Sequence, residues 1–174
     1  MFIKLKALFC EMEEPLKEPN IIEISSKKLV GARIINSLAE DKTGILWQRF
    51  MPKRKMIKNR VNSDYWSVQN YENFEPSSFT EDTKFEKWAA VEVSECADLP
   101  DELETFDLPA GKYAVFIHHG LASEFHKALR YIFENWLPAS GFQLDERPHF
   151  EIMGSKYYGP TDANSEEETW IPIK

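Results

Sequence analysis

One glutamate in the last quarter of the chain is the residue best placed to act on a ligand. Glu151 lies in the segment His149–Met153, where apolar and polar residues alternate. In a β-strand this alternation sends Phe150 and Ile152 to one face and Glu151 to the other. If the apolar pair packs beneath a helix, Glu151 faces away from the helices and is partly removed from water. It could then balance a cationic ligand or act as a general base. The alternative is an ordinary solvent-facing strand glutamate.

Aromatic side chains on the expected strands are the second group with a chemical role. They make up 13% of the chain, and they suit either a core or a cavity that binds flat or cationic molecules. Trp88 and Trp170 each alternate with small or apolar neighbours, so both are expected to line a pocket beside Glu151. The complete set of aromatic candidates is Trp88, Trp170, Trp66, Tyr71 and Phe116.

Histidine and cysteine spacing predicts no metal site. His118 and His119 point to opposite faces of one expected strand, and the other two histidines lie on different elements. No pair has H-x-x-x-H spacing, and no cysteine pair supports them. We therefore expect no metal and no cofactor. His118 remains a candidate ligand-binding residue, and Tyr71, Tyr113 or His118 could donate a hydrogen bond to a ligand.

Composition limits the class of partner and the location. The formal net charge of −8 argues against nucleic acid as the main partner. Cys10 and Cys96 show no disulfide spacing, the first ten residues lack a cleavage site, and no apolar run is long enough for a membrane span. We therefore expect a cytoplasmic protein without membrane contact.

The order strand, helix, strand, strand occurs twice, with corresponding elements roughly 80 residues apart. It predicts two pseudo-repeats, 22–94 and 110–174, within one domain at 22–174, preceded by an N-terminal arm at 1–21. The expected strands are 21–37, 65–72, 85–93, 112–118, 148–153 and 167–173, and a turn is expected at 108–111. The expected helices begin near Thr43 and Ser123.

The second helix has the clearest period. Its apolar residues recur at helical spacing and predict one unbroken buried stripe; they are Phe125, Ala128, Leu129, Ile132, Phe133 and Trp136. Pro138 and Gly141 are expected to end this helix, as Pro52 is expected to end the first one.

Several short motifs, taken together, resemble the GyrI-like small-molecule-binding family, which includes effector-binding domains of AraC-type and MerR-type transcription regulators. The most telling are Lys112-Tyr-Ala-Val-Phe-Ile-His-His-Gly120 and Pro148-His-Phe-Glu151. The others occupy residues 28–31, 46–52, 67–71, 136–141 and 168–173. The resemblance covers residues 22–174.

The resemblance implies an α+β fold of two strand-helix-strand-strand units, which form one concave antiparallel sheet with both helices on its outer face. It also implies a ligand in a central cleft against Glu151. We expect a stand-alone module that binds a cationic or amphipathic aromatic molecule, with no direct DNA binding. Whether it forms a homodimer or works with a regulator stays open.

Two alternatives follow from the same resemblance. Some family members hydrolyse cyclopropane-containing toxins, so Glu151 could instead activate a water molecule as a catalytic residue. Others inhibit gyrase through their outer surface. We favour binding, because the sequence shows no second acid or base placed to protonate a leaving group.

Overall fold

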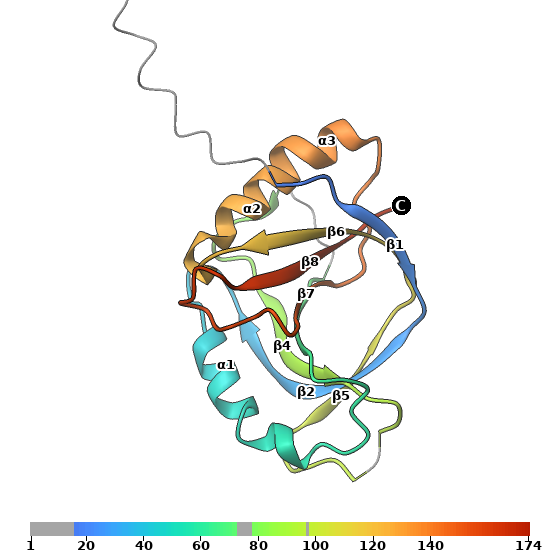
Figure 1. Ribbon diagram of the computed structural model, residues 1–174, viewed down its shortest axis with the longest axis vertical. Coiled ribbons are helices and arrows are strands. Elements are labelled where there is room, and N and C mark those ends of the chain that lie inside the picture. The colour runs from blue at the N-terminus through green and yellow to red at the C-terminus, as the bar shows by residue number, and fades with distance from the viewer. Residues whose placement is uncertain (1–15, 73–77, 97) are drawn as a thin grey trace, which may run out of the picture.

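Eight strands form a single antiparallel sheet in the computed structural model, which describes residues 16–72, 78–96 and 98–174 (Figure 1). The strands are β1 (Asn20–Ile24), β2 (Lys27–Asn36), β3 (Tyr65–Asn70), β4 (Phe85–Glu92), β5 (Glu104–Leu108), β6 (Gly111–His119), β7 (His149–Met153) and β8 (Glu166–Pro172). Their spatial order is β1-β6-β8-β7-β3-β4-β2-β5, so β7 and β3 meet at the centre. The predicted antiparallel sheet with helices on one side is confirmed.

The strand pairing repeats with a shift of 82 residues. Val68 pairs with Trp88, and 82 positions later Phe150 pairs with Trp170. The two edge strands obey the same rule, because Leu29 pairs with Phe106 in β5 while Ile24 of β1 pairs with Gly111. Each repeat thus sends its first strand to the sheet edge of the other repeat.

Two sequence predictions about strands are wrong. The single strand expected at 21–37 is two strands, β1 and β2, that separate at Ser25 and Ser26 and pair with different partners. Strand β5 was not expected at all, because its five residues precede a segment that looks like a turn. Both misses have one cause, since β1 and β5 pair with strands far away in the sequence.

The helices are α1 (Thr43–Phe50), α2 (Phe125–Tyr131) and α3 (Leu137–Ser140), with short 3-10 turns η1 (Lys53–Met56) and η3 (Ala122–Glu124) and a π-helical segment η4 (Ile132–Trp136). Figure 1 shows α1 and α2 on the same side of the sheet. In the described part of the chain, no helix combines the length and apolar character needed to cross a membrane.

Pro138 does not end the second helix, contrary to expectation. The backbone N–H of Leu137 donates to the carbonyl of Ile132, five residues back, so the helix widens into a π turn just before the proline. Such a turn removes the ordinary hydrogen bond that a proline would break. The helix continues to Ser140 and ends at Gly141, whose φ of 78° suits a glycine. Ala128, Ile132 and Trp136 are its buried positions.

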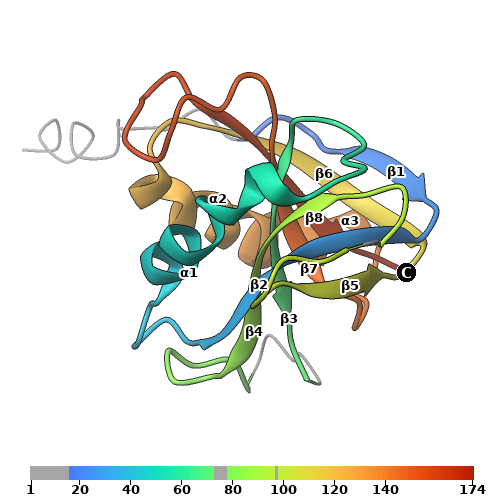
Figure 2. The same cartoon turned by 90° about the horizontal axis from the view of Figure 1, so that it is seen from below.

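Apolar residues form a separate core on each side of the sheet. Figure 2 shows the same cartoon from below, with α1 and α2 together on one side of the strands. On the helix face, α1 packs on small residues of β2 and β4, such as Ala32 and Ala89, and the second helix packs on Ala114 and Phe116 of β6. The opposite face, here called the aromatic face, is not covered by any helix of the described residues. Its buried cluster consists of Leu29, Trp66, Val68, Trp88, Ala90, Leu108, Tyr113, Val115, Phe150 and Trp170.

Candidate functional site

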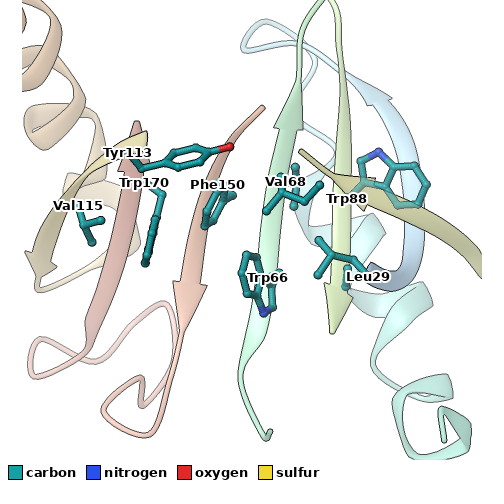
Figure 3. Packing of buried hydrophobic residues seen from close by; sticks show 10 residues of the cluster. Leu29, Trp66, Val68, Trp88, Tyr113, Val115, Phe150 and Trp170 are labelled. Atoms are coloured by element: carbon teal, nitrogen blue, oxygen red, sulfur yellow. The ribbon is translucent and has the colours of Figure 1, made fainter. Parts of the chain in front are cut away.

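Glu151 lies on the helix face, and the orientation predicted from the sequence is therefore wrong. Figure 3 shows Phe150 and Trp170 next to each other in the aromatic face. Their rings stack at a centroid distance of 5.2 Å. The next residue along β7, Glu151, points the opposite way and pairs with Ser67 and Thr169. The alternation was right, but Phe150 packs against other aromatic side chains of its own sheet face and not against a helix; these are Trp66, Tyr113 and Trp170.

Polar side chains separate the two apolar clusters on the helix face. We call this row the central polar strip, and it consists of Ser67, Gln69, Lys87, Glu151, Glu167 and Thr169. These residues share one face by the strand registers, and they lie on the strands between the positions covered by α1 and those covered by the second helix. A polar row between two helix-covered cores is where a small molecule could reach the sheet.

Glu151 is almost buried, with 8% of its surface exposed. Its carboxylate accepts a hydrogen bond of 2.9 Å from the amide of Gln69, whose nitrogen also lies 3.3 Å from the hydroxyl of Ser67. In the described residues no Lys, Arg or His lies within 4.0 Å of this carboxylate. The side chain of Glu151 is thus oriented by a neutral partner, the amide of Gln69.

Glu167 of β8 is the second acidic residue of the strip. It occupies the same face as Thr169, which pairs with Glu151. Burial, and then the negative charge of Glu151, raise the pKa of Glu167 to about 7, while Lys87 opposes the shift. Two acidic side chains therefore share this part of the strip, and no Lys, Arg or His that the structure describes lies within 4.0 Å of either carboxyl group.

Two tyrosines border the carboxylates. Burial raises the pKa of Tyr157 to about 12, with further contributions from Glu167 and Glu151. Burial and the charge of Glu151 also raise the pKa of Tyr71 far above its ordinary value. Both hydroxyls therefore stay protonated at neutral pH and can donate hydrogen bonds. The buried hydroxyl of Thr169, 1% exposed as a residue, has no hydrogen-bond partner among the described residues.

His149 and His118 lie on the same face as Glu151. Burial lowers the pKa of His149 to about 3, so it is neutral at physiological pH, and Phe133 stacks on it at 5.9 Å. His118 contacts the ring of Phe125 and lies 3.2 Å from the carbonyl of Leu121. His118 therefore joins β6 to the start of the second helix.

The predicted ligand-binding residues divide between the two faces. Tyr71, Phe116 and His118 share the helix face with Glu151, and Phe116 packs edge-on against Trp136 in the core. Trp66, Trp88 and Trp170 lie on the aromatic face, on the far side of the sheet from the carboxylate. The structure thus brings Tyr71 close to Glu151 and separates the three tryptophans from it.

Sequence reasoning missed Gln69, Tyr157 and Glu167. Gln69 is the position 82 residues before Glu151, so the repeat itself would have paired them about the centre of the sheet. Glu167 lies two residues before Thr169 in β8, so the alternation of a strand places both side chains on the same face. Tyr157 lies in the connection after β7, and no sequence pattern marks it.

Two surface cavities lie at the sheet ends, and neither includes Glu151. One, of about 500 Å³, is lined by Asp64, Ile117, Ile152, Gly154, Ser155, Lys156, Glu166, Glu167 and Glu168. The other, of about 460 Å³, lies near Arg147 and Phe106. No group of three or more His, Cys, Asp or Glu residues in the described ranges is arranged to hold a metal ion.

Comparison with known proteins places this geometry in a family. A family model described as "GyrI-like small molecule binding domain" matches residues 17–174. The transcriptional regulator BrlR of Pseudomonas aeruginosa is 30% identical over 155 residues, which are 88% of this chain and 54% of that protein. The chain therefore spans about half the length of this relative.

Solved structures share the fold. The structure of SAV2435 bound to tetraphenylphosphonium has a TM-score of 0.69 and 19% identity, over 90% of this chain and 94% of the other. A hydrolase from Listeria innocua has a TM-score of 0.57 and 13% identity, over 93% and 94% of the two chains. The chain belongs to the GyrI-like small molecule binding domain family.

Proposed function

We propose that this protein binds a lipophilic organic cation at the central polar strip, with Glu151 as the counter-charge. The observation that carries the proposal is the pair of carboxylates, Glu151 and Glu167, which share one sheet face without a basic group within 4.0 Å in the described chain. A buried charge without a partner is costly, and a cationic ligand would remove that cost on binding.

The strip also supplies the other contacts that such a ligand needs. Tyr71 and Tyr157 offer π faces, and cation–π contacts contribute roughly 0.5–2 kcal/mol each, depending on desolvation. They replace Trp66, Trp88 and Trp170, which were expected in this role and form the core of the aromatic face. The bound tetraphenylphosphonium in the structure of SAV2435 supports this class of ligand.

We propose the role of a ligand sensor or scavenger, by the relation to BrlR and to other regulator domains. We do not propose direct DNA binding, because a net charge of −8 repels the phosphate backbone of DNA.

The test is titration calorimetry with tetraphenylphosphonium and, as a neutral comparison, triphenylphosphine oxide. The wild type should bind the cation, and Glu151→Gln should weaken binding at least about tenfold because it removes the buried charge. Glu168→Gln is the matched control, since Glu168 precedes Thr169 on β8 but faces away from Glu151, where it accepts a hydrogen bond from Trp170. Equal binding of the cation and the neutral compound, or equal loss in both variants, would contradict the proposal.

Hydrolysis is a second candidate, and one observation favours it. Glu167, with a pKa of about 7, is the second acid or base that the sequence did not reveal. Glu151 could take a proton from water as the oxygen adds to a cyclopropane carbon. Glu167 or Tyr157 would then protonate the group that receives the electrons of the broken ring bond. Multiple turnover of a cyclopropane-bearing alkylator, lost in Glu151→Gln, would establish hydrolysis in place of simple binding.

A further inference from the structure

We propose that Glu167 selects ligands by charge, so that the site prefers molecules with two cationic centres over matched molecules with one. This inference rests on the proposed function and adds a ligand class to it. Its basis is the placement of Glu167 relative to Glu151, together with the groups that surround both.

The strand register fixes the relation between the two carboxylates. Glu151 pairs with Thr169, and Glu167 lies two residues before Thr169 on the same face of β8. Diagonal neighbours of this kind in an antiparallel pair are about 7–8 Å apart at the backbone. Glu151 raises the pKa of Glu167 through its charge and not through a hydrogen bond, and its carboxylate accepts a hydrogen bond from Gln69 instead. The two carboxyl groups therefore offer positions for two separate positive charges.

The groups around Glu167 do not neutralise it. Glu151 faces it from β7 and Tyr157 from the β7–β8 connection, and both interact with it electrostatically. His118 of β6 pairs with Glu167 in the ladder, and Lys87 of β4 lies on the same face. Only Lys87 lowers the pKa of Glu167, and among the described residues neither lysine nor histidine comes within 4.0 Å of its carboxylate.

The charge of the ligand then decides which state of the pair binds it. One cationic centre balances Glu151, and Glu167 keeps a proton or remains an uncompensated anion. Two cationic centres balance both carboxylates in their ionised form. Opposite charges attract more strongly at a partly buried site than in bulk water, so the second contact should appear as tighter binding of the ligand with two cationic centres.

The pH dependence follows from the same arrangement. Burial and the charge of Glu151 raise the pKa of Glu167 to about 7, so Glu167 is mostly protonated at pH 6 and mostly ionised at pH 8. A dication binds the ionised form better, and its affinity should therefore rise with pH over this range. A monocation depends less on the state of Glu167, so its affinity should change less.

Ethidium and propidium provide a matched pair of probes, because they share one aromatic ring system and propidium carries an additional quaternary ammonium group. Fluorescence titrations of the wild type at pH 8 should give at least about tenfold tighter binding of propidium. Glu167→Gln should reduce that ratio to about twofold or less and remove its dependence on pH between 6 and 8. Glu168→Gln should leave the ratio and its pH dependence as in the wild type, which controls for the general attraction of a dication to an acidic protein.

The outcomes separate the two proposals. If Glu151→Gln weakens both dyes but Glu167→Gln leaves the ratio unchanged, the selective role of Glu167 is wrong and the proposed cation site stands. If neither dye binds to the wild type, or Glu151→Gln has no effect on either, both proposals are wrong. Circular dichroism and thermal denaturation of each variant establish that a lost ratio does not reflect a lost fold.

Discussion

At the scale of single residues, the acidic groups of the proposed cation site should lower the stability of the unliganded protein. Glu151 and Glu167 remain close without a cation, although an uncompensated carboxylate in a buried position destabilises the folded state. Functional sites commonly retain groups of this kind. The cost should be measurable at Glu167, whose folded-state pKa is raised.

We predict that Glu167→Gln stabilises the unliganded protein at pH 8. The pKa of Glu167 rises from 4.5 to about 7 on folding, so the stability that its neutral form provides is present below pH 4.5 and is lost as the pH rises through 7. Glutamine is neutral throughout, and the variant should therefore gain up to about 3 kcal/mol at pH 8 and little at pH 4.5. Urea denaturation at both pH values checks this, with Glu168→Gln as the control. A variant that is no more stable than the wild type at pH 8 would show that Glu167 is solvated.

At the scale of elements, the close approach of β2 to β4 depends on a glycine. Gly31 pairs with Ala90 in β4 and with Glu104 in β5. A Cβ at this position would meet the backbone oxygen of Ala89 and would lie 2.6 Å from the Cβ of Ala90. Tyr113 occupies the equivalent position 82 residues later, and its ring packs on Phe150. The second half of the sheet therefore has room for a large side chain where the first half has none.

We predict that Gly31→Ala destabilises the fold by about 1–3 kcal/mol, because strand backbone must move to accept the methyl group. Gly44→Ala is the matched comparison, since Gly44 lies in α1 and an added Cβ meets nothing within 4 Å. There alanine should stabilise the helix by about 0.5–1 kcal/mol. Thermal and urea unfolding of the two variants should therefore move in opposite directions, and a shift of the same sign in both would contradict this account.

At the scale of the whole molecule, the exchanged edge strands make the two repeats depend on each other. Strand β1 belongs to the first repeat but pairs with β6, and β5 precedes β6 but pairs with β2. The aromatic-face cluster also draws residues from both repeats. We therefore propose that residues 22–174 fold as one unit, as the sequence suggested, and that neither repeat is a domain by itself.

We predict that the fragments 1–98 and 99–174 do not fold when produced separately. Each lacks a strand that its own edge requires and half of the aromatic-face cluster. When they are co-expressed, they should assemble into a one-to-one complex with the circular dichroism spectrum of the intact chain. Size-exclusion chromatography and urea unfolding provide the measurements, and cooperative unfolding of either fragment alone would contradict the prediction.

The sequence by itself determined the elements and the residue at the centre of the site. Local alternation and helical spacing depend only on neighbouring residues, so β3, β4, β6, β7, β8 and the first turns of both helices were predictable. The same alternation showed that Glu151 and Phe150 face opposite ways. The duplicated order of elements predicted two half-sheet units with a seam between them, and the family resemblance implied that they form a single antiparallel sheet. The structure showed that β3 and β7 meet at its centre.

Only the tertiary structure decided which side of the sheet faces the helices. A period of two shows which residues share a face, but it does not show which face the helices cover. Both faces of this sheet carry apolar clusters, so hydrophobicity does not distinguish them either. The helices cover the face with Ala89 and Ala114, where small side chains allow close approach, and the face with Trp88 and Trp170 packs on itself. Glu151 therefore lies near Glu167 on the helix face, while the tryptophans lie on the other face. These neighbours depend on pairing between strands that are distant in the sequence, and local patterns do not determine that pairing.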